Sequence, residues 1–109
     1  MNQDTICAIA TAPGGAIGII RVSGPDAIAI TDRLFTPASG KPLAERAAYT
    51  LTFGQILSPA GEVVDEVLVS LFRAPHSYTG EDSVEISCHG SAYIPVSYTH
   101  LRAHETTLH

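Results

Sequence analysis

The stretch from Arg73 to Gly90, RAPHSYTGEDSVEISCHG, joins a loop sequence to a strand sequence. Residues 73–82 are rich in turn formers and hydroxyl groups, which predicts a loop. Residues 83–89 alternate between apolar and polar side chains, which predicts a strand with one buried face. The polar face carries Glu85 and His89. Two interpretations are open: an ordinary half-exposed edge strand, or one wall of a ligand site.

Composition limits the classes of protein that the chain can belong to. Its 109 residues suffice for one domain, and a hydrophobic fraction of 45% with 16% charged residues excludes disorder by composition. A net charge of −5 argues against independent nucleic-acid binding. Cys7 and Cys88 lie in apolar runs and predict buried free thiols. No segment resembles a signal peptide or a membrane span, so we expect a soluble, cytoplasmic protein.

The rest of the chain alternates strand and helix signals. One helix is predicted to begin near Pro25, with Ser23 or Gly24 as its cap. Residues 36–48 show no periodicity and predict a long loop. Strands are predicted at residues 5–11, 17–23, 49–57, 62–72 and 83–89. The order predicts a small α+β domain with a mixed or antiparallel sheet and one or two helices.

Arg21 and Glu85 are the two charged residues that the strand pattern does not explain. Each lies on a strand whose other positions are apolar or small. An arginine in such a place needs a partner. Either the two side chains form a partly buried ion pair across the sheet, or they line a ligand pocket together.

The other motifs give weaker evidence for a functional site. The glycine turn at residues 12–16 lacks the Lys-Ser/Thr ending of a phosphate loop. The tail contains histidines at positions 100, 104 and 109, of which the first two are spaced i, i+4, but we expect no metal site, because zinc needs a third ligand beside such a pair and a supporting second shell. We also expect no residue that performs covalent catalysis.

Three stretches resemble one family closely. They are DTICAIATAPGGAIGIIRVSGPDA near the start, GEVVDEVLVSLFRAPHSYTGEDSVEISCHG in the middle, and within the latter the long string SYTGEDSVEISCHG. Together they are similar to the N-terminal domain of the tRNA-modification GTPases called MnmE or TrmE. The resemblance covers about Asp4 to Ile94.

The resemblance implies a fold like the tetrahydrofolate-binding domain of aminomethyltransferases. It also implies binding of 5-formyl- or 5,10-methylene-tetrahydrofolate and a homodimer formed through this domain. The family's folate-contacting arginine and glutamate fall on Arg21 and Glu85. Candidate pocket or loop residues beside them are Tyr78, Thr79, Gly80 and His89. In the family, the whole protein modifies the wobble uridine of tRNA together with an MnmG-type FAD protein.

The chain also departs from the family pattern. The turn at residues 13–18 is one residue shorter than usual and lacks its arginine, so its ligand contacts are not implied. We expect residues 1–94 to be an incomplete N-terminal domain of marginal stability and residues 95–109 to be a foreign tail. GTP, Mg²⁺ and K⁺ would bind only in domains beyond this chain. The alternatives are a ligand-free dimerisation scaffold and a small folate-dependent one-carbon transferase.

Overall fold

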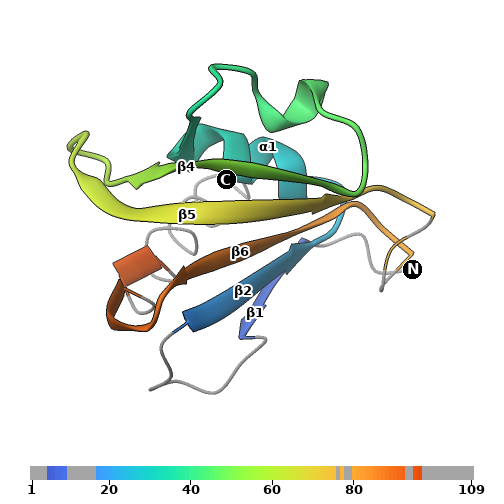
Figure 1. Cartoon of the computed structure of the whole chain (residues 1–109). Coiled ribbons are helices and arrows are strands. Elements are labelled where there is room, and N and C mark those ends of the chain that lie inside the picture. The colour runs from blue at the N-terminus through green and yellow to red at the C-terminus, as the bar shows by residue number, and fades with distance from the viewer. Residues whose placement is uncertain (1–4, 10–16, 76, 78–79, 93–94, 97–109) are drawn as a thin grey trace.

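The computed structural model describes residues 5–9, 17–75, 77, 80–92 and 95–96. In the described part, six strands and one α-helix form the fold, together with two short 3₁₀ turns (Figure 1). The elements are β1 (Ile6–Ile9), β2 (Ile17–Ser23), α1 (Ala27–Leu34), β3 (Phe35–Pro37), η1 (Leu43–Glu45), β4 (Thr50–Leu57), β5 (Val63–Phe72), β6 (Ser83–His89) and η2 (Gly90–Ala92).

The strands form one antiparallel sheet in the order β1-β2-β6-β5-β4-β3. The prediction of a small α+β domain is therefore confirmed, and the sheet is antiparallel throughout its described strands. The predicted hairpin of residues 49–57 and 62–72 is confirmed as β4 and β5. The edge-strand interpretation of residues 83–89 is wrong, because β6 pairs with β2 on one side and β5 on the other.

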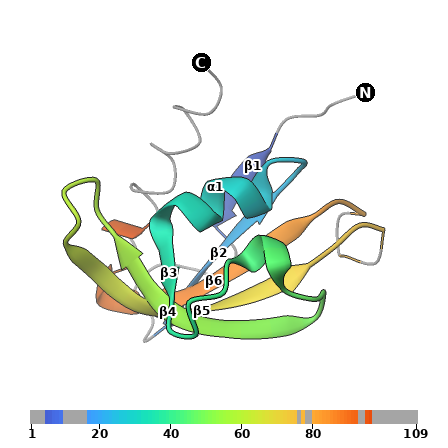
Figure 2. The same ribbon diagram turned by 90° about the horizontal axis from the view of Figure 1, so that it is seen from above.

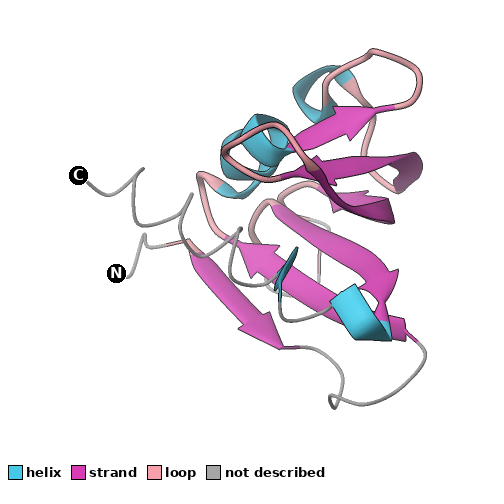
Figure 3. Ribbon diagram, turned by 90° about the vertical axis from the view of Figure 1, so that its left-hand side faces the viewer, coloured by secondary structure: helices cyan, strands magenta, loops and turns pink. Residues whose placement is uncertain are grey.

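Helix α1 lies over one face of the sheet (Figures 2 and 3). Its buried residues are Ala27, Ile28, Ile30 and Thr31. The strands present aliphatic side chains to the same side, so the core lies between helix and sheet. The strand residues that are fully or almost fully buried are Ile20, Val22, Ile56, Val67, Val69, Leu71, Val84, Ile86 and Cys88.

The start of α1 differs from the prediction. The N-cap is Asp26, and no side chain caps the helix by a hydrogen bond. Instead, the backbone N–H of Asp26 donates to the hydroxyl of Thr5 at 2.9 Å. The hydroxyl that holds the residue before the helix thus belongs to a residue 21 positions earlier, which local helix signals do not reveal.

The prediction of an aperiodic loop over residues 36–48 is wrong in part, because this segment contains most of β3 and all of η1. The carboxylate of Asp32 accepts hydrogen bonds from the backbone N–H groups of Leu43 and Ala44 at 2.8 and 3.0 Å. The guanidinium of Arg73 donates to the carbonyl groups of Leu43, Ala44 and Arg46. Two distant charged side chains therefore hold a segment that has no periodicity of its own.

Candidate ligand-binding site

The face of the sheet opposite α1 is the open face. Its side chains form rows that cross β4, β5, β6 and β2, because neighbouring strands place paired residues on the same side. One row is Leu51, Ser70, Glu85 and Arg21. The next row towards the far end of β6 is Phe53, Leu68, Ser87 and Ile19. Ser70 on β5 thus lies between Leu51 and Glu85, and Ser87 on β6 lies between Leu68 and Ile19.

Arg21 and Glu85 are direct cross-strand partners. The Nε of Arg21 donates to Oε2 of Glu85 at 2.7 Å, and an amino group of the same guanidinium lies 2.5 Å from that oxygen. The arginine side chain is 37% exposed and the glutamate side chain 16%. The sequence left open whether these residues pair or line a pocket, and the structure shows that they pair.

The carboxylate of Glu85 has a second oxygen for accepting hydrogen bonds. The two nitrogen–oxygen contacts given above both fall on Oε2, and Oε1 is the other acceptor atom that an incoming N–H group can use. The residue opposite Glu85 on β5 is Ser70, whose side chain is small. A flat group with adjacent N–H donors can therefore approach the carboxylate from the open face, next to a fixed positive charge.

The loop before β6 lies at the same end of β2. Its hydroxyl and carboxylate groups hold its own backbone: the Ser77 hydroxyl donates to the carbonyl of Glu81, and Ala74 N–H donates to the carboxylate of Asp82. Gly80 has φ +77°, a conformation that favours glycine, and its N–H donates to the carbonyl of Ser77. Tyr78 and Thr79, the other two loop residues predicted for the site, lie outside the described residues.

The loop is joined to the start of the helix segment. The N–H of Gly24 donates to the carbonyl of Asp82 at 2.9 Å, and the hydroxyl of Ser23 donates to the carboxylate of Glu81 at 3.3 Å. Residues 80–82 therefore lie beside the end of β2 at Ser23, which is two residues beyond Arg21 in the sequence. This places Gly80 in the loop that borders the ion pair.

His89 does not lie with the Arg21–Glu85 pair. It is four residues along β6 from Glu85, which is about 13 Å in an extended strand. Its Nδ1 lies 2.8 Å from Oδ1 of Asp65, and its backbone N–H donates to Oδ2 of the same carboxylate. Asp65 is not among the residues predicted for the site. Its only local signal is an acidic residue inside a mostly apolar strand, and its contact with His89 depends on the strand register.

A shallow groove of about 310 Å³ adjoins His89 on the open face. Its lining residues are Ile17, Phe53, Glu66, Val67, Leu68, Ser87, Cys88 and His89. The groove belongs to the rows beyond the Arg21–Glu85 pair, and neither member of the pair lines it. The open face therefore has two distinct features: an ion pair near the loop, and a groove towards the opposite end of the strands.

Cys88 behaves as the alternation predicted. Its side chain is buried, with 3% of the residue exposed, and its thiol lies 3.5 Å from the carbonyl of Gly18. Burial raises the pKa of the Cys88 thiol, and the negative charge of Asp65 acts in the same direction. Cys88 is thus a core residue, on the opposite side of β6 from His89. The other predicted thiol, Cys7, has no described side chain.

In the described ranges, no three acidic, histidine or cysteine side chains come together in a way that would hold a metal ion. No helix in the same ranges has the length and apolar character to cross a membrane.

The family comparison matches residues 5–106 to the profile described as GTP-binding protein TrmE N-terminus. Among curated proteins, the chain is similar to the tRNA modification GTPases MnmE of three bacteria. The protein of Bacteroides fragilis (strain YCH46) is 76% identical over 95 residues, that of Phocaeicola vulgatus 61% over 126, and that of Symbiobacterium thermophilum 50% over 91.

These alignments cover 83–86% of this chain. The chain spans only a fifth to a quarter of the length of these relatives, 20–25%. The predicted boundary at residue 94 stays a prediction, because the family profile extends to residue 106 while the relatives align with less of the chain.

Proposed function

Because the chain belongs to the family of TrmE N-terminal domains, we propose that it binds a tetrahydrofolate derivative, 5-formyl- or 5,10-methylene-tetrahydrofolate, on the open face of its sheet. The observation that carries the proposal is the half-buried Arg21–Glu85 pair, on a face that no helix of the described residues covers. Ion pairs are expensive to desolvate, so a pair in this position is better explained by a ligand than by stability.

The chemistry of the pair suits a folate. The pterin ring presents an N–H group next to an amino group, and a carboxylate accepts two such hydrogen bonds side by side. Arg21 lies on the other side of the same carboxylate, where it fixes the position of Glu85 and offers a planar cation for stacking or for an acidic tail. Gly80, in the bordering loop, leaves room at the edge of the site. Tyr78, Thr79 and Gly80 remain candidate loop residues of this pocket.

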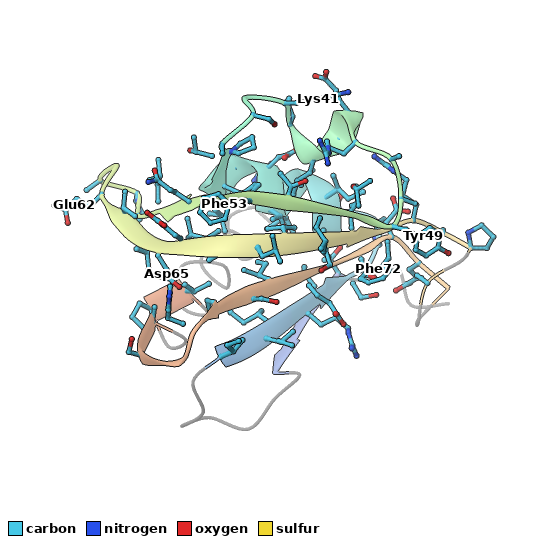
Figure 4. All side chains as sticks on the ribbon, in the orientation of Figure 1. Lys41, Tyr49, Phe53, Glu62, Asp65 and Phe72 are labelled. Carbon is cyan, nitrogen blue, oxygen red and sulfur yellow. The ribbon has the colours of Figure 1, made fainter. Side chains whose placement is uncertain are left out.

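Calorimetric titration with 5-formyltetrahydrofolate tests the proposal. We expect saturable binding to the wild-type chain and a loss of about tenfold or more in Glu85→Ala, since a hydrogen-bonded charge contributes about 1.5–3 kcal/mol. Glu62→Ala is the matched control, because it removes the same side chain at the exposed β4–β5 turn (Figure 4). This turn follows the Leu57–Val63 pair, at the other end of the hairpin from the Leu51–Ser70 pair in the row of Glu85. Equal affinities for wild type and Glu85→Ala would refute the assignment.

A second function, dimerisation, is favoured by a different observation. The open face carries large apolar side chains that remain exposed, namely Ile17 (61%), Tyr49 (64%), Leu51 (59%) and Phe53 (53%). Patches of this kind mark interaction sites. We propose that a second copy of the chain covers the part of this face that carries Tyr49 and Leu51, outside the lining of the groove beside His89. A scaffold that dimerises without any ligand is the alternative, and the folate titration separates the two.

For the whole protein, we propose the role that its relatives' name states, modification of tRNA by a GTPase. In this proposal the folate supplies a one-carbon unit for wobble uridine, and an MnmG-type FAD protein is the partner. GTP, Mg²⁺ and K⁺ would bind outside this chain. The acidic net charge of −5 gives this part no electrostatic footprint for tRNA, so other parts of the protein would hold the nucleic acid. A small one-carbon transferase remains the runner-up.

A further inference from the structure

In the His89–Asp65 pair, the carboxylate faces Nδ1 of the imidazole, and Nε2 is the nitrogen that a ligand can meet. The Asp65 side chain is only 11% exposed, and its two oxygens accept from the ring and from the backbone of His89. Because a carboxylate accepts hydrogen bonds, the facing Nδ1 carries the proton, and Nε2 of the neutral ring is an acceptor. The His89 side chain is 69% exposed, so its outer edge is open to a ligand.

The groove beside this imidazole is lined by apolar side chains and a carboxylate. Its side walls include Ile17, Phe53 and Leu68, which are apolar and exposed. Its polar lining includes Glu66, and among the described residues no lysine or arginine lines it. An apolar surface with a carboxylate and an imidazole acceptor, and without a competing cation, complements a flat ring that carries positively charged N–H donors.

We propose that this groove is a second ligand site, separate from the Arg21–Glu85 pair, for a planar cationic group with N–H donors. The ring lies on the apolar walls, Nε2 of His89 accepts one hydrogen bond, and Glu66 supplies the opposite charge. Asp65 is a positioning residue, because it acts only through the orientation and tautomer of His89.

Benzamidine is the probe, because it is a flat aromatic cation with N–H donors. Binding to the full chain is followed through the imidazole ¹⁵N signals of His89 at about pH 8, where ordinary imidazoles are neutral. The spectrum of His89→Gln assigns these signals among the five histidines of the chain. One protein concentration is used throughout, so that the oligomeric state stays constant. Benzoate, with the same ring and the opposite charge, is the control ligand.

The variant Asp65→Asn tests whether Asp65 sets the tautomer of His89 or only supports the fold. An amide in this place can donate to Nδ1, which moves the ring proton to Nε2 and turns the acceptor into a donor. We expect the ¹⁵N signals to report this exchange and benzamidine affinity to fall about tenfold, the equivalent of one charge-assisted hydrogen bond. Glu66→Gln, which leaves the His89–Asp65 pair intact, should also weaken binding. Glu85→Ala should not change it.

Three results would overturn the proposal. They are no saturable shift with benzamidine, equal binding of benzoate, and unchanged affinity in Glu66→Gln. If Asp65→Asn fails to fold, Glu66→Gln alone decides. Because Glu85→Ala removes the proposed folate contact but not the groove, failure of one site leaves the other measurable.

Discussion

At the scale of single residues, the placement of Arg21 and Glu85 combines a weak structural contact with a strong recognition group. Their nitrogen–oxygen distances are 2.7 and 2.5 Å, but more than a third of the arginine side chain is exposed. Solvent screens such a pair, and exposed ion pairs contribute about 0–1 kcal/mol. The pair therefore contributes little to holding the sheet, which agrees with the proposal that its role is ligand binding.

This argument predicts that Glu85→Gln lowers stability little. Glutamine keeps the volume and one oxygen acceptor but loses the charge. We expect the free energy of unfolding to fall by less than about 1 kcal/mol, because solvent already screens the pair. Chemical denaturation measures this change. A loss of several kcal/mol would show that the pair is structural.

Cys88 gives a prediction about pH. Burial raises the pKa of its thiol above the ordinary value of 9.0, so the folded state favours the neutral form. The stability that this preference contributes is fully present below pH 9.0 and decreases as the pH rises through the higher folded value. In a Cys7→Ser background, where Cys88 is the remaining cysteine, reaction with a thiol reagent should be much slower than after unfolding. Equal rates in the folded and unfolded states would contradict the burial.

At the scale of elements, two contacts hold segments that local signals do not define. Strand β3 comes so close to β4 that a Cβ on Gly54 would lie 2.3 Å from the carbonyl oxygen of Thr36 and 2.7 Å from the ring of Phe35. The segment after β3 is held by Asp32 and Arg73. Both contacts join residues that are distant in sequence, so short-range patterns cannot report them.

Gly54→Ala should therefore destabilise the sheet edge. The added methyl group meets a backbone oxygen, which cannot move aside as a flexible side chain does, and overpacking typically costs about 1–3 kcal/mol. Thermal denaturation measures the loss. Gly40→Asn is the control, because nothing lies within 4 Å of its Cβ position and asparagine tolerates positive φ. Equal melting temperatures would refute the close approach.

Arg73→Ala should release the segment at residues 43–46. Three backbone carbonyl groups lose a charged donor, and the buried Leu43 loses its support. We expect a loss of about 1–2 kcal/mol and faster hydrogen exchange at the amides of Leu43 and Ala44. Arg73→Lys should rescue this only in part, because an ammonium group lacks the planar fork of donors. Unchanged exchange in Arg73→Ala would contradict this role.

Much of the fold follows from sequence pattern. Strand β2 occupies residues 17–23 and β6 residues 83–89 as predicted, because apolar side chains alternate or run unbroken there. The cap of α1, the segments β3 and η1, and the interior place of β6 were missed. Each of these depends on contacts from distant residues, such as Thr5 to Asp26, and periodicity does not carry that information.

The residues of the candidate site could likewise be predicted from the sequence only in part. Arg21 and Glu85 stand out in the sequence because charges are rare within apolar strands, but their register was needed to show that they pair. His89 was singled out without its partner Asp65. Asp65 lies on β5, near the bulged end of the β4–β5 hairpin, and its contact with His89 depends on the register between strands.

At the scale of the whole molecule, the open face is the feature that needs explanation. One side of the sheet forms the core with α1, whereas the other leaves Tyr49, Leu51 and Phe53 exposed. Figure 4 shows Tyr49 next to Phe72 at one end, where the two rings meet edge to face with centroids 6.2 Å apart. This surface is apolar beside the ion pair, which agrees with the proposals that the face binds a ligand and a second copy.

Leu51→Glu should weaken the proposed dimer. A charge in the row of Glu85 adds repulsion and removes apolar contact area, so we expect the dissociation constant to rise at least about tenfold. Sedimentation velocity over a concentration series measures this change. Val63→Glu is the matched control, because Val63 is also exposed (52%) but lies at the hairpin end. A wild-type chain that stays monomeric at every concentration would rule out the dimer.

The most direct test of the central proposal is to map the bound folate on the protein. In ¹H–¹⁵N spectra titrated with 5-formyltetrahydrofolate, we expect saturable shifts centred on the amides of Arg21, Ser70 and Glu85, with α1 unaffected. The same titration of Glu85→Ala should give no saturable shifts at these positions. Shifts centred on α1, or no saturable shift in the wild-type chain, would contradict folate binding at the Arg21–Glu85 pair.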